Sequence, residues 1–255
     1  MLPDFAHQLA DPLFAELLFD RLPDVVFFIK DADSRYVAVN ETLRVRCGCA
    51  VKADLLGRTT EELFPTELGA SYARQDHEVI ARGQPIADRL ELHLYPDRAA
   101  GWCLTYKMPL FDRYGAVIGL AGVSRDLRVP DREDPHYRRI AAAIQHLHGH
   151  FGDALTIAEL AGISGFSVAQ FERHIHAIFG LTPKQLLIKT RLEAATRLLC
   201  GHDSVAAIAA ACGYADHSAF SRQFRTVVGV SPREFRAMHE LKTKLLPKQE
   251  SEHMP

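Results

Sequence analysis

The 255 residues are 47% hydrophobic and 24% charged, a composition typical of folded globular proteins and not of disordered or fibrous ones. No stretch approaches the roughly 18 uninterrupted apolar residues of a membrane helix. No basic segment leads into an apolar core at the N-terminus, so we expect neither a membrane span nor a secretory signal. The five cysteines form no Cys-x-x-Cys pair, which favours a reduced, cytoplasmic protein without a zinc-finger framework.

The first half of the chain begins with a helix and a hairpin. Asp11-Pro12, followed by apolar residues at helical spacing, predicts a short amphipathic helix over 12–22. Two β-rich runs, 25–30 and 35–40, flank a polar turn and predict a β-hairpin. A helical middle follows over 41–82, and we expect it to be interrupted at Gly48, Gly57, Pro65 and Gly69.

Three more strands are predicted over 86–95, 102–108 and 117–127, because apolar and polar residues alternate there. The pattern indicates an antiparallel sheet with helices on one face, and a concave apolar cavity between the two layers as the natural ligand site. Aromatic residues at these positions are either ordinary core or the lining of that cavity. The candidate ligand-binding residues are Phe28, Tyr72, Trp102 and Tyr106.

This half resembles a PAS sensor domain over roughly residues 20–128. The resemblance rests on LPDVVFFIKD…RYVAVN, LLGRT…ELFP, DHEVIARGQP and KMPLFDRYGAVIGLAGVSRDL, of which Gly115 to Asp126 is the most characteristic stretch. It implies an α+β fold, a five-stranded antiparallel sheet with helices. It also implies that the domain senses a small-molecule signal or mediates dimerisation, with the helix over 12–22 as a dimer seam or a lid.

We expect no cofactor and no metal. His77 lies in the helix where haem-binding PAS domains often carry their axial histidine, but the spacing before Gly83 differs from theirs. The Asn-Cys-Arg segment of flavin-linked PAS proteins is missing from the sequence. His146, His148 and His150 alternate at positions that point apart on a helix, which is typical of a solvated helix end.

The segment 129–136 has the composition of a linker, with two prolines and several charges. Net charge changes sign across it, from −6 over 1–136 to +6 over 137–248. Opposite signs on two halves indicate two domains, with the basic one facing a polyanion.

The basic half contains an internal repeat. Segments 156–183 and 204–232 match, with Phe171 and Phe220 49 residues apart, as are Arg173 and Arg222. Each copy predicts a short helix, a glycine-containing turn and a longer helix. The turns are placed at Gly162 and Gly213, and the helices begin with capping residues. The run 183–199 between the copies predicts one connecting helix, which would set two recognition helices roughly 34 Å apart for successive major grooves.

This half resembles the DNA-binding domain of the AraC/XylS family over about residues 137–240. The second copy carries the family signature at Cys212-Gly213-Tyr214, Asp216, Phe220, Gly229 and Ser231-Pro232. The resemblance implies a sequence-specific transcription regulator that binds double-stranded promoter DNA, with RNA polymerase as a partner. The predicted domains are a PAS-like domain over 1–128, the linker over 129–136, an all-α domain with two helix-turn-helix units over 137–243, and a tail over 244–255.

The family places its DNA contacts on the outer faces of the two recognition helices, 167–179 and 216–228. Arginine can donate twice to guanine, glutamate can accept from cytosine, and other basic residues position phosphates. The alternative for any single arginine is an internal salt bridge. The candidate DNA-binding residues are Ala169, Gln170, Glu172, Arg173, His217, Ser218, Ser221, Arg222 and Arg225.

These observations together predict a cytoplasmic, DNA-binding transcription regulator that forms a homodimer through its PAS-like domain. One alternative keeps the PAS-like domain as a ligand-free protein-interaction module. A second alternative is an enzyme with a helical accessory domain. The chain has no Ser-His-Asp order, paired carboxylates or phosphate-binding glycine loop that would support a reaction, so we do not expect an enzyme.

Overall fold

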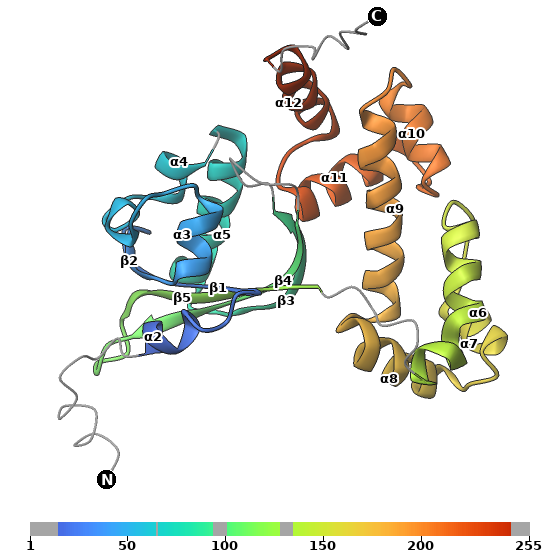
Figure 1. The fold of residues 1–255 in the computed structure, drawn as a ribbon, viewed down its shortest axis with the longest axis horizontal. Coiled ribbons are helices and arrows are strands. Elements are labelled where there is room, and N and C mark those ends of the chain that lie inside the picture. Colours follow the sequence, from blue (N-terminus) through green and yellow to red (C-terminus); the bar gives the residue numbers. More distant parts are fainter. Residues whose placement is uncertain (1–14, 65, 94–100, 128–134, 246–255) are drawn as a thin grey trace, which may run out of the picture. The chain divides into compact units, whose positions relative to one another are not determined.

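The computed structural model describes residues 15–64, 66–93, 101–127 and 135–245 (Figure 1). The chain divides into two compact units, with the boundary after Leu127. None of the described helices combines the length and the apolar character that a membrane span requires.

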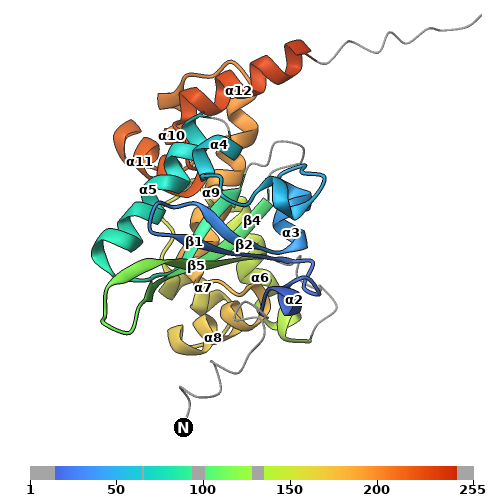
Figure 2. The same ribbon diagram turned by 90° about the vertical axis from the view of Figure 1, so that its left-hand side faces the viewer.

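The first unit is an α+β domain, as predicted. Its five strands form one antiparallel sheet in the order β2-β1-β5-β4-β3. Helices α3, α4 and α5 lie on one side of this sheet and α2 on the other (Figure 2). The elements are α2 (Ala15–Phe19), β1 (Val25–Asp31), β2 (Tyr36–Val39), α3 (Glu41–Arg46), the 3-10 turn η1 (Lys52–Asp54), α4 (Thr60–Leu63), α5 (Thr66–Arg82), β3 (Ile86–His93), β4 (Gly101–Phe111) and β5 (Val117–Asp126).

The prediction that Gly69 interrupts a helix is wrong. Gly69 lies inside α5, and a Cβ atom there would come within 2.8 Å of the Cα atom of Glu61 in α4. Because glycine has no side chain, the two helices can pack this closely. Pro65 and residues 12–14 of the first predicted helix lie outside the described residues.

The structure places a pocket between the sheet and the helices, as expected, and its lining combines apolar side chains with polar ones. Thr105 and Lys107 on β4 line the helix-covered side of the sheet, opposite Ser124 and Gly122 of β5. Successive side chains of a strand point to opposite faces, so the apolar residues of β4 between them point away from the helices. On β4 the helices therefore cover the polar side of the alternation, whereas Val26 and Phe28 of β1 and Leu120 of β5 form an apolar core with residues of α3 and α5.

The second unit is all-α and contains the two predicted helix-turn-helix units, α7–α8 and α10–α11, joined by α9. In Figure 1, α8 lies at one end of α9 and α10 lies toward the other. The helices are α6 (Pro135–His150), α7 (Ile157–Ile163), α8 (Val168–Phe179), α9 (Pro183–Leu199), α10 (Val205–Ala211), α11 (His217–Val228) and α12 (Pro232–Leu245).

Local capping signals set most of these helix starts. The Ser167 hydroxyl accepts the backbone N–H of Gln170, whose side-chain oxygen accepts the backbone N–H of Ser167. Thr182 with Gln185 begins α9 in the same way. Each reciprocal pair satisfies two backbone donors that a helix start leaves without partners.

Two predicted boundaries need correction. Gly162 does not end α7, which includes it; the turn is made by Gly165, whose φ of +68° is a left-handed conformation that favours glycine. The linker was expected to extend to residue 136, but α6 begins at Pro135, since proline is well suited to the first turn of a helix. Residues 128–134 lie outside the described residues.

The two repeat copies share the same buried positions. Phe171 and Phe220 are both 0% exposed, and Leu160 and Ile208 are at most 1% exposed. The sequence repeat is therefore a repeat of core positions as well as of helix ends.

Candidate DNA-binding face and buried polar pocket

Helix α8 exposes the four residues that were predicted to face DNA. Ala169, Gln170, Glu172 and Arg173 are all exposed. The side-chain oxygen of Gln170 is occupied by the cap at Ser167, so this residue presents mainly its amide N–H groups.

Helix α11 exposes a second set of polar residues. His217, Ser218, Arg222 and Arg225 are exposed, and Ser221 is half-buried with its hydroxyl 3.4 Å from Nε2 of His217. This arrangement leaves both arginines exposed to solvent.

The candidate arginines differ in whether they form an internal salt bridge. Within the described part of the chain, Arg173 and Arg222 form no ion pair, whereas the Arg225 guanidinium lies 3.9 Å from the carboxylate of Glu234. An exposed pair at that distance contributes little to stability. The guanidinium groups of Arg173 and Arg222 are therefore exposed and not held by any carboxylate among the described residues.

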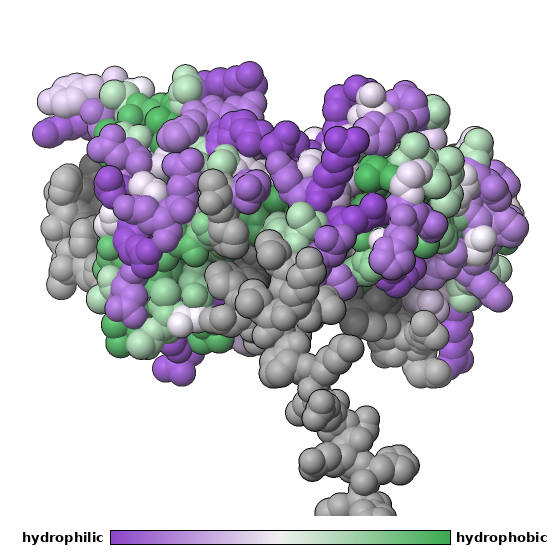
Figure 3. All heavy atoms as spheres, turned by 90° about the horizontal axis from the view of Figure 1, so that it is seen from above, coloured by the Kyte–Doolittle hydropathy of each residue, from purple (hydrophilic) through white to green (hydrophobic). Residues whose placement is uncertain are grey.

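Hydrophilic residues cover much of the molecular face in Figure 3, with hydrophobic residues in patches between them. Among the exposed basic residues of the second unit, Lys184 and Arg233 lie in the first turns of α9 and α12. These side chains are suited to phosphate contacts, which position a protein on DNA without specifying sequence.

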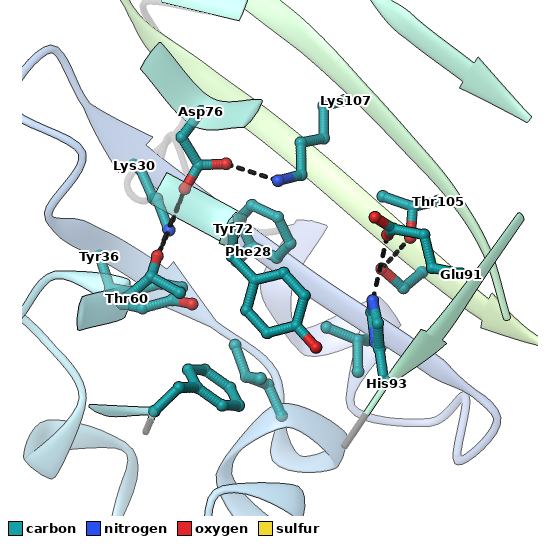
Figure 4. A pocket seen from close by; sticks show the side chains of 14 residues that line it. Phe28, Lys30, Tyr36, Thr60, Tyr72, Asp76, Glu91, His93, Thr105 and Lys107 are labelled. Carbon is teal, nitrogen blue, oxygen red and sulfur yellow. Dashed lines mark hydrogen bonds and ion pairs between the residues drawn. The ribbon is translucent and has the colours of Figure 1, made fainter. Parts of the chain in front are cut away.

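The first unit contains a pocket between the sheet and helices α3 to α5 (Figure 4). Its space admits the centres of water-sized molecules over about 40 Å³. Since one water needs roughly 10–15 Å³ on this measure, there is room for about three waters. The lining residues are Val26, Phe28, Lys30, Tyr36, Leu43, Thr60, Phe64, Tyr72, Asp76, Glu91, His93, Thr105, Lys107 and Ser124.

At one end of the pocket, two lysines share one carboxylate. Lys30 donates to Asp76 and to the hydroxyl of Thr60, and Lys107 donates to the other oxygen of Asp76 at 2.6 Å. All three charged side chains are at most 5% exposed. Burial lowers the pKa of Lys30. Burial would raise the pKa of Asp76, but Lys107 and Lys30 together hold it below its ordinary value.

At the other end, Glu91 is the centre of a second polar group. Gln75 donates to its carboxylate at 2.7 Å, and Nε2 of His93 lies 3.1 Å from it. Burial alone would raise the pKa of Glu91, but the hydrogen bond and charge of His93, the charge of Lys107 and the hydroxyl of Thr105 lower it to about 2.

We expect this low pKa to make the stability of the first unit depend on acid pH. The Glu91 pKa falls from 4.5 when exposed to about 2 in the fold, so its contribution is complete above pH 4.5 and is lost as pH falls toward 2. The loss amounts to about 3 kcal/mol of unfolding free energy. About 2 kcal/mol of it is lost between pH 6 and pH 3, where denaturant unfolding followed by the fluorescence of Trp102, the single tryptophan, measures it. Glu91→Gln is expected to flatten the pH dependence, and an unchanged slope would contradict the assignment.

Glu91, His93 and Cys103 also form, among the described residues, the one group whose potential metal-ligand atoms lie within 4.8 Å of one another. The Arg89 guanidinium lies 3.5 Å from the Glu91 carboxylate, and Lys107 adds a second positive charge nearby. Positive charges at this distance disfavour a cation, so we interpret the group as a hydrogen-bond network.

The structure places the four candidate aromatic residues on different faces. Phe28 and Tyr72 line the pocket. Trp102 and Tyr106 do not, because they alternate along β4 with Thr105 and their side chains leave the opposite face of the sheet. His77, weighed as an axial ligand, is exposed.

Sequence reasoning missed the charged residues of the pocket: Lys30, Asp76, Glu91 and Lys107. One signal was available. Lys30 continues an otherwise apolar strand, VVFFIK, where a charged residue needs a buried partner if the strand is central. Its partner Asp76 is 46 residues away, and no local pattern connects the two.

Comparisons with known proteins match each unit separately. The chain is 38% identical over 99 residues to the HTH-type transcriptional activator RhaS of Escherichia fergusonii, covering 38% of this chain and 36% of that protein. It is 30% identical over 149 residues to a Streptomyces antibioticus protein named as AraC-like, covering 58% and 40%. The family model of the PAS fold matches residues 19–132, and that of a helix-turn-helix domain matches residues 160–238.

The chain joins a PAS fold to an AraC-type helix-turn-helix domain. Both resemblances drawn from the sequence are thereby confirmed at the level of the domains. The chain spans less than half the length of the two curated relatives. A VqmA–ligand–DNA complex from Vibrio cholerae is 24% identical, with a TM-score of 0.43, and covers 73% of this chain and 89% of that one. A score of this size supports no argument from that structure.

Proposed function

We propose that the protein is a sequence-specific transcription regulator in which the AraC-type domain reads promoter DNA. The observation that carries this proposal is the duplication: two helix-turn-helix units with the same buried phenylalanine, joined by α9, each exposing polar residues on its second helix. Curated relatives of this region are named as transcription regulators.

Each recognition helix supplies a different part of the contact. Arg173 and Arg222 are proposed to contact base edges, where a guanidinium can donate to O6 and N7 of guanine. Glu172 is suited to the amino group of cytosine, while Ala169, Ser218 and Ser221 offer small or hydroxyl-bearing contacts. Gln170 and His217 lie beside them on the two helices, and Arg225 is proposed to contact phosphate.

The PAS unit is proposed to sense a small molecule in the pocket between its sheet and helices. A signal must bind one state of this unit better than another to change the population of the DNA-competent state. The unit is also proposed to form the homodimer: Leu17 and Leu18 of α2 are 65% and 64% exposed, and a dimer would cover them. We also propose that the protein is cytoplasmic, is not an enzyme and contacts RNA polymerase.

The proposal is tested by selecting bound sequences from random duplexes with the full chain and comparing the selected site with a scrambled one. A regulator of this kind is expected to prefer its specific site by roughly 10³-fold or more at physiological salt. Equal binding of the two duplexes would contradict sequence-specific recognition.

Arg222→Ala is expected to weaken binding to the selected site by about 1–3 kcal/mol and to relax the preference at one base pair. Competition binding with single-base variants of the site measures both effects. The matched control is Arg74→Ala, which removes the same charge from an exposed position on α5 in the first unit. If both variants lose the same affinity and neither changes base preference, Arg222 contributes only general charge.

A further inference from the structure

Helix α6 carries two histidines on one face at its C-terminal end. His146 and His150 are four residues apart, and residues at this spacing are neighbours on a helix surface, whereas His148 between them is not. The two rings stack, with their centres 4.4 Å apart and their planes 26° from parallel. The prediction that these histidines point apart is therefore wrong for His146 and His150.

Each of these two imidazoles has a carboxylate beside it. Nε2 of His146 lies 3.6 Å from the carboxylate of Glu159, in the first turn of α7. Nδ1 of His150 lies 3.1 Å from the carboxylate of Asp153, in the connection between α6 and α7. Among the described residues, neither carboxylate forms an ion pair with a lysine or an arginine. This distinguishes the set from the group around Glu91, where positive side chains disfavour a cation.

The carboxylate of Glu159 is directed to α6 and not to the start of its own helix. Thr156 begins α7, and its hydroxyl accepts the backbone N–H of Glu159 at 3.1 Å. The capping boxes that begin α8 and α9 also contain a returning side-chain hydrogen bond, whereas at α7 the structure has only the half made by Thr156. The Glu159 carboxylate therefore remains available to a ligand beside His146.

Arg191 of α9 fixes the backbone that carries the other carboxylate. Its guanidinium donates to the backbone oxygens of Phe151 and Asp153 at 2.8 and 2.9 Å. The four side chains of the set are between 30% and 69% exposed. Exposed ion pairs contribute little to stability, so these side chains can exchange their present contacts for bonds to an ion at small cost.

We propose that His146, His150, Asp153 and Glu159 bind a zinc ion. Two histidines at i and i+4 on one helix face are a spacing by which helices hold zinc. Imidazole nitrogen and carboxylate oxygen are ordinary zinc ligands, at about 2.0–2.2 Å, and four protein ligands complete the tetrahedral shell of a structural site. The ligand atoms of the set do not yet all lie within 4.8 Å of one another, so binding requires the carboxylates to turn toward a shared ion.

Zinc at this position would connect the end of α6 to the start of α7. Helix α7 packs against both α6 and α8, the recognition helix of the first unit. Because an ion that binds only the folded form opposes local opening, we expect zinc to slow hydrogen exchange in the last turn of α6 and the first turn of α7.

Zinc binding is measured by titration calorimetry on the full chain without an affinity tag, at pH 7.5, where most histidine side chains are neutral. His146→Ala and His150→Ala are each expected to weaken binding about tenfold or more, since even residues that only support a metal ligand typically contribute that much. His148→Ala is the matched control, because it removes a histidine from the same helix end and is expected to leave the affinity unchanged. Glu159→Gln, which removes the charge at nearly constant shape, is expected to weaken binding as well.

Hydrogen exchange with and without Zn²⁺ then localises the ion. Slower exchange at α6 and α7 is expected in the wild type and in His148→Ala, but not in His146→Ala or His150→Ala. The proposal is overturned if the wild type binds no zinc, or if these two variants bind it as tightly as His148→Ala, as they would if other histidines or cysteines held the ion. Unchanged affinity in Glu159→Gln would contradict the connection to α7. Alanine is favourable in a helix, and circular dichroism checks that each variant folds.

Discussion

Asp76→Ala is expected to lower the unfolding free energy of the PAS unit by about 3–5 kcal/mol, because it leaves Lys30 and Lys107 buried without a carboxylate. All three side chains are at most 5% exposed, so water cannot replace the missing partner. Denaturant unfolding followed by Trp102 fluorescence measures the effect in this unit, since the single tryptophan lies on β4. Asp33→Asn is the matched control, because Asp33 is exposed and its change should stay within about 0.5 kcal/mol.

A triple variant separates charge from packing. Replacing Asp76 with alanine and both lysines with methionine removes the unpaired charges together, and apolar replacement of a whole buried ion group is often neutral or stabilising. We expect this triple variant to recover most of the stability that Asp76→Ala loses. If the single variant is as stable as the wild type, the lysines are not held by Asp76 in the way that the structure indicates.

Phe220→Ala is expected to destabilise the second helix-turn-helix unit by about 3–5 kcal/mol and to abolish site-specific DNA binding. Phe220 is 0% exposed and packs against Phe224 and Tyr214, with ring centres 5.5 and 5.1 Å away, so its removal leaves a cavity under the recognition helix. Hydrogen exchange of the α11 backbone amides reports the loss locally, in a unit without tryptophan.

The equivalent phenylalanine in the first repeat copy provides a comparison for the Phe220→Ala variant. Phe171→Ala removes the equivalent residue of the first copy and is expected to increase exchange in α8. Val168→Ala, at a position 41% exposed on the same helix, is the control with little expected effect. Unchanged exchange in α11 of the Phe220 variant would show that this side chain does not hold the recognition helix.

Local chemistry explains why the DNA-binding unit was predictable in detail. A helix start depends on residues only three positions apart, as at Ser167 with Gln170 and Thr182 with Gln185, so the sequence contains the complete signal. The 49-residue repeat then placed both copies in register, and their buried phenylalanines followed from helical spacing. The turn of the first copy was misplaced by three residues, from Gly165 to Gly162 in the last turn of α7.

The arrangement of the pocket could not be predicted from the sequence. Alternation along β4 determined that Thr105 and Lys107 share one face and Trp102 and Tyr106 the other, but not which face the helices cover. That choice is made by the packing of α5 and its neighbouring helices against the sheet.

The sequence alone therefore determined the two domain types, the strands and the paired helix-turn-helix units, since each follows from neighbouring residues or from a repeat. Only the tertiary structure decided that charged side chains line part of the pocket. Asp76 meets Lys30 and Lys107 across 46 and 31 residues, and Gly69 lies inside α5 where the backbone of Glu61 leaves no room for a Cβ atom. Such contacts arise when distant segments are brought together in one core, and the burial that makes them matter does not exist until the chain has folded.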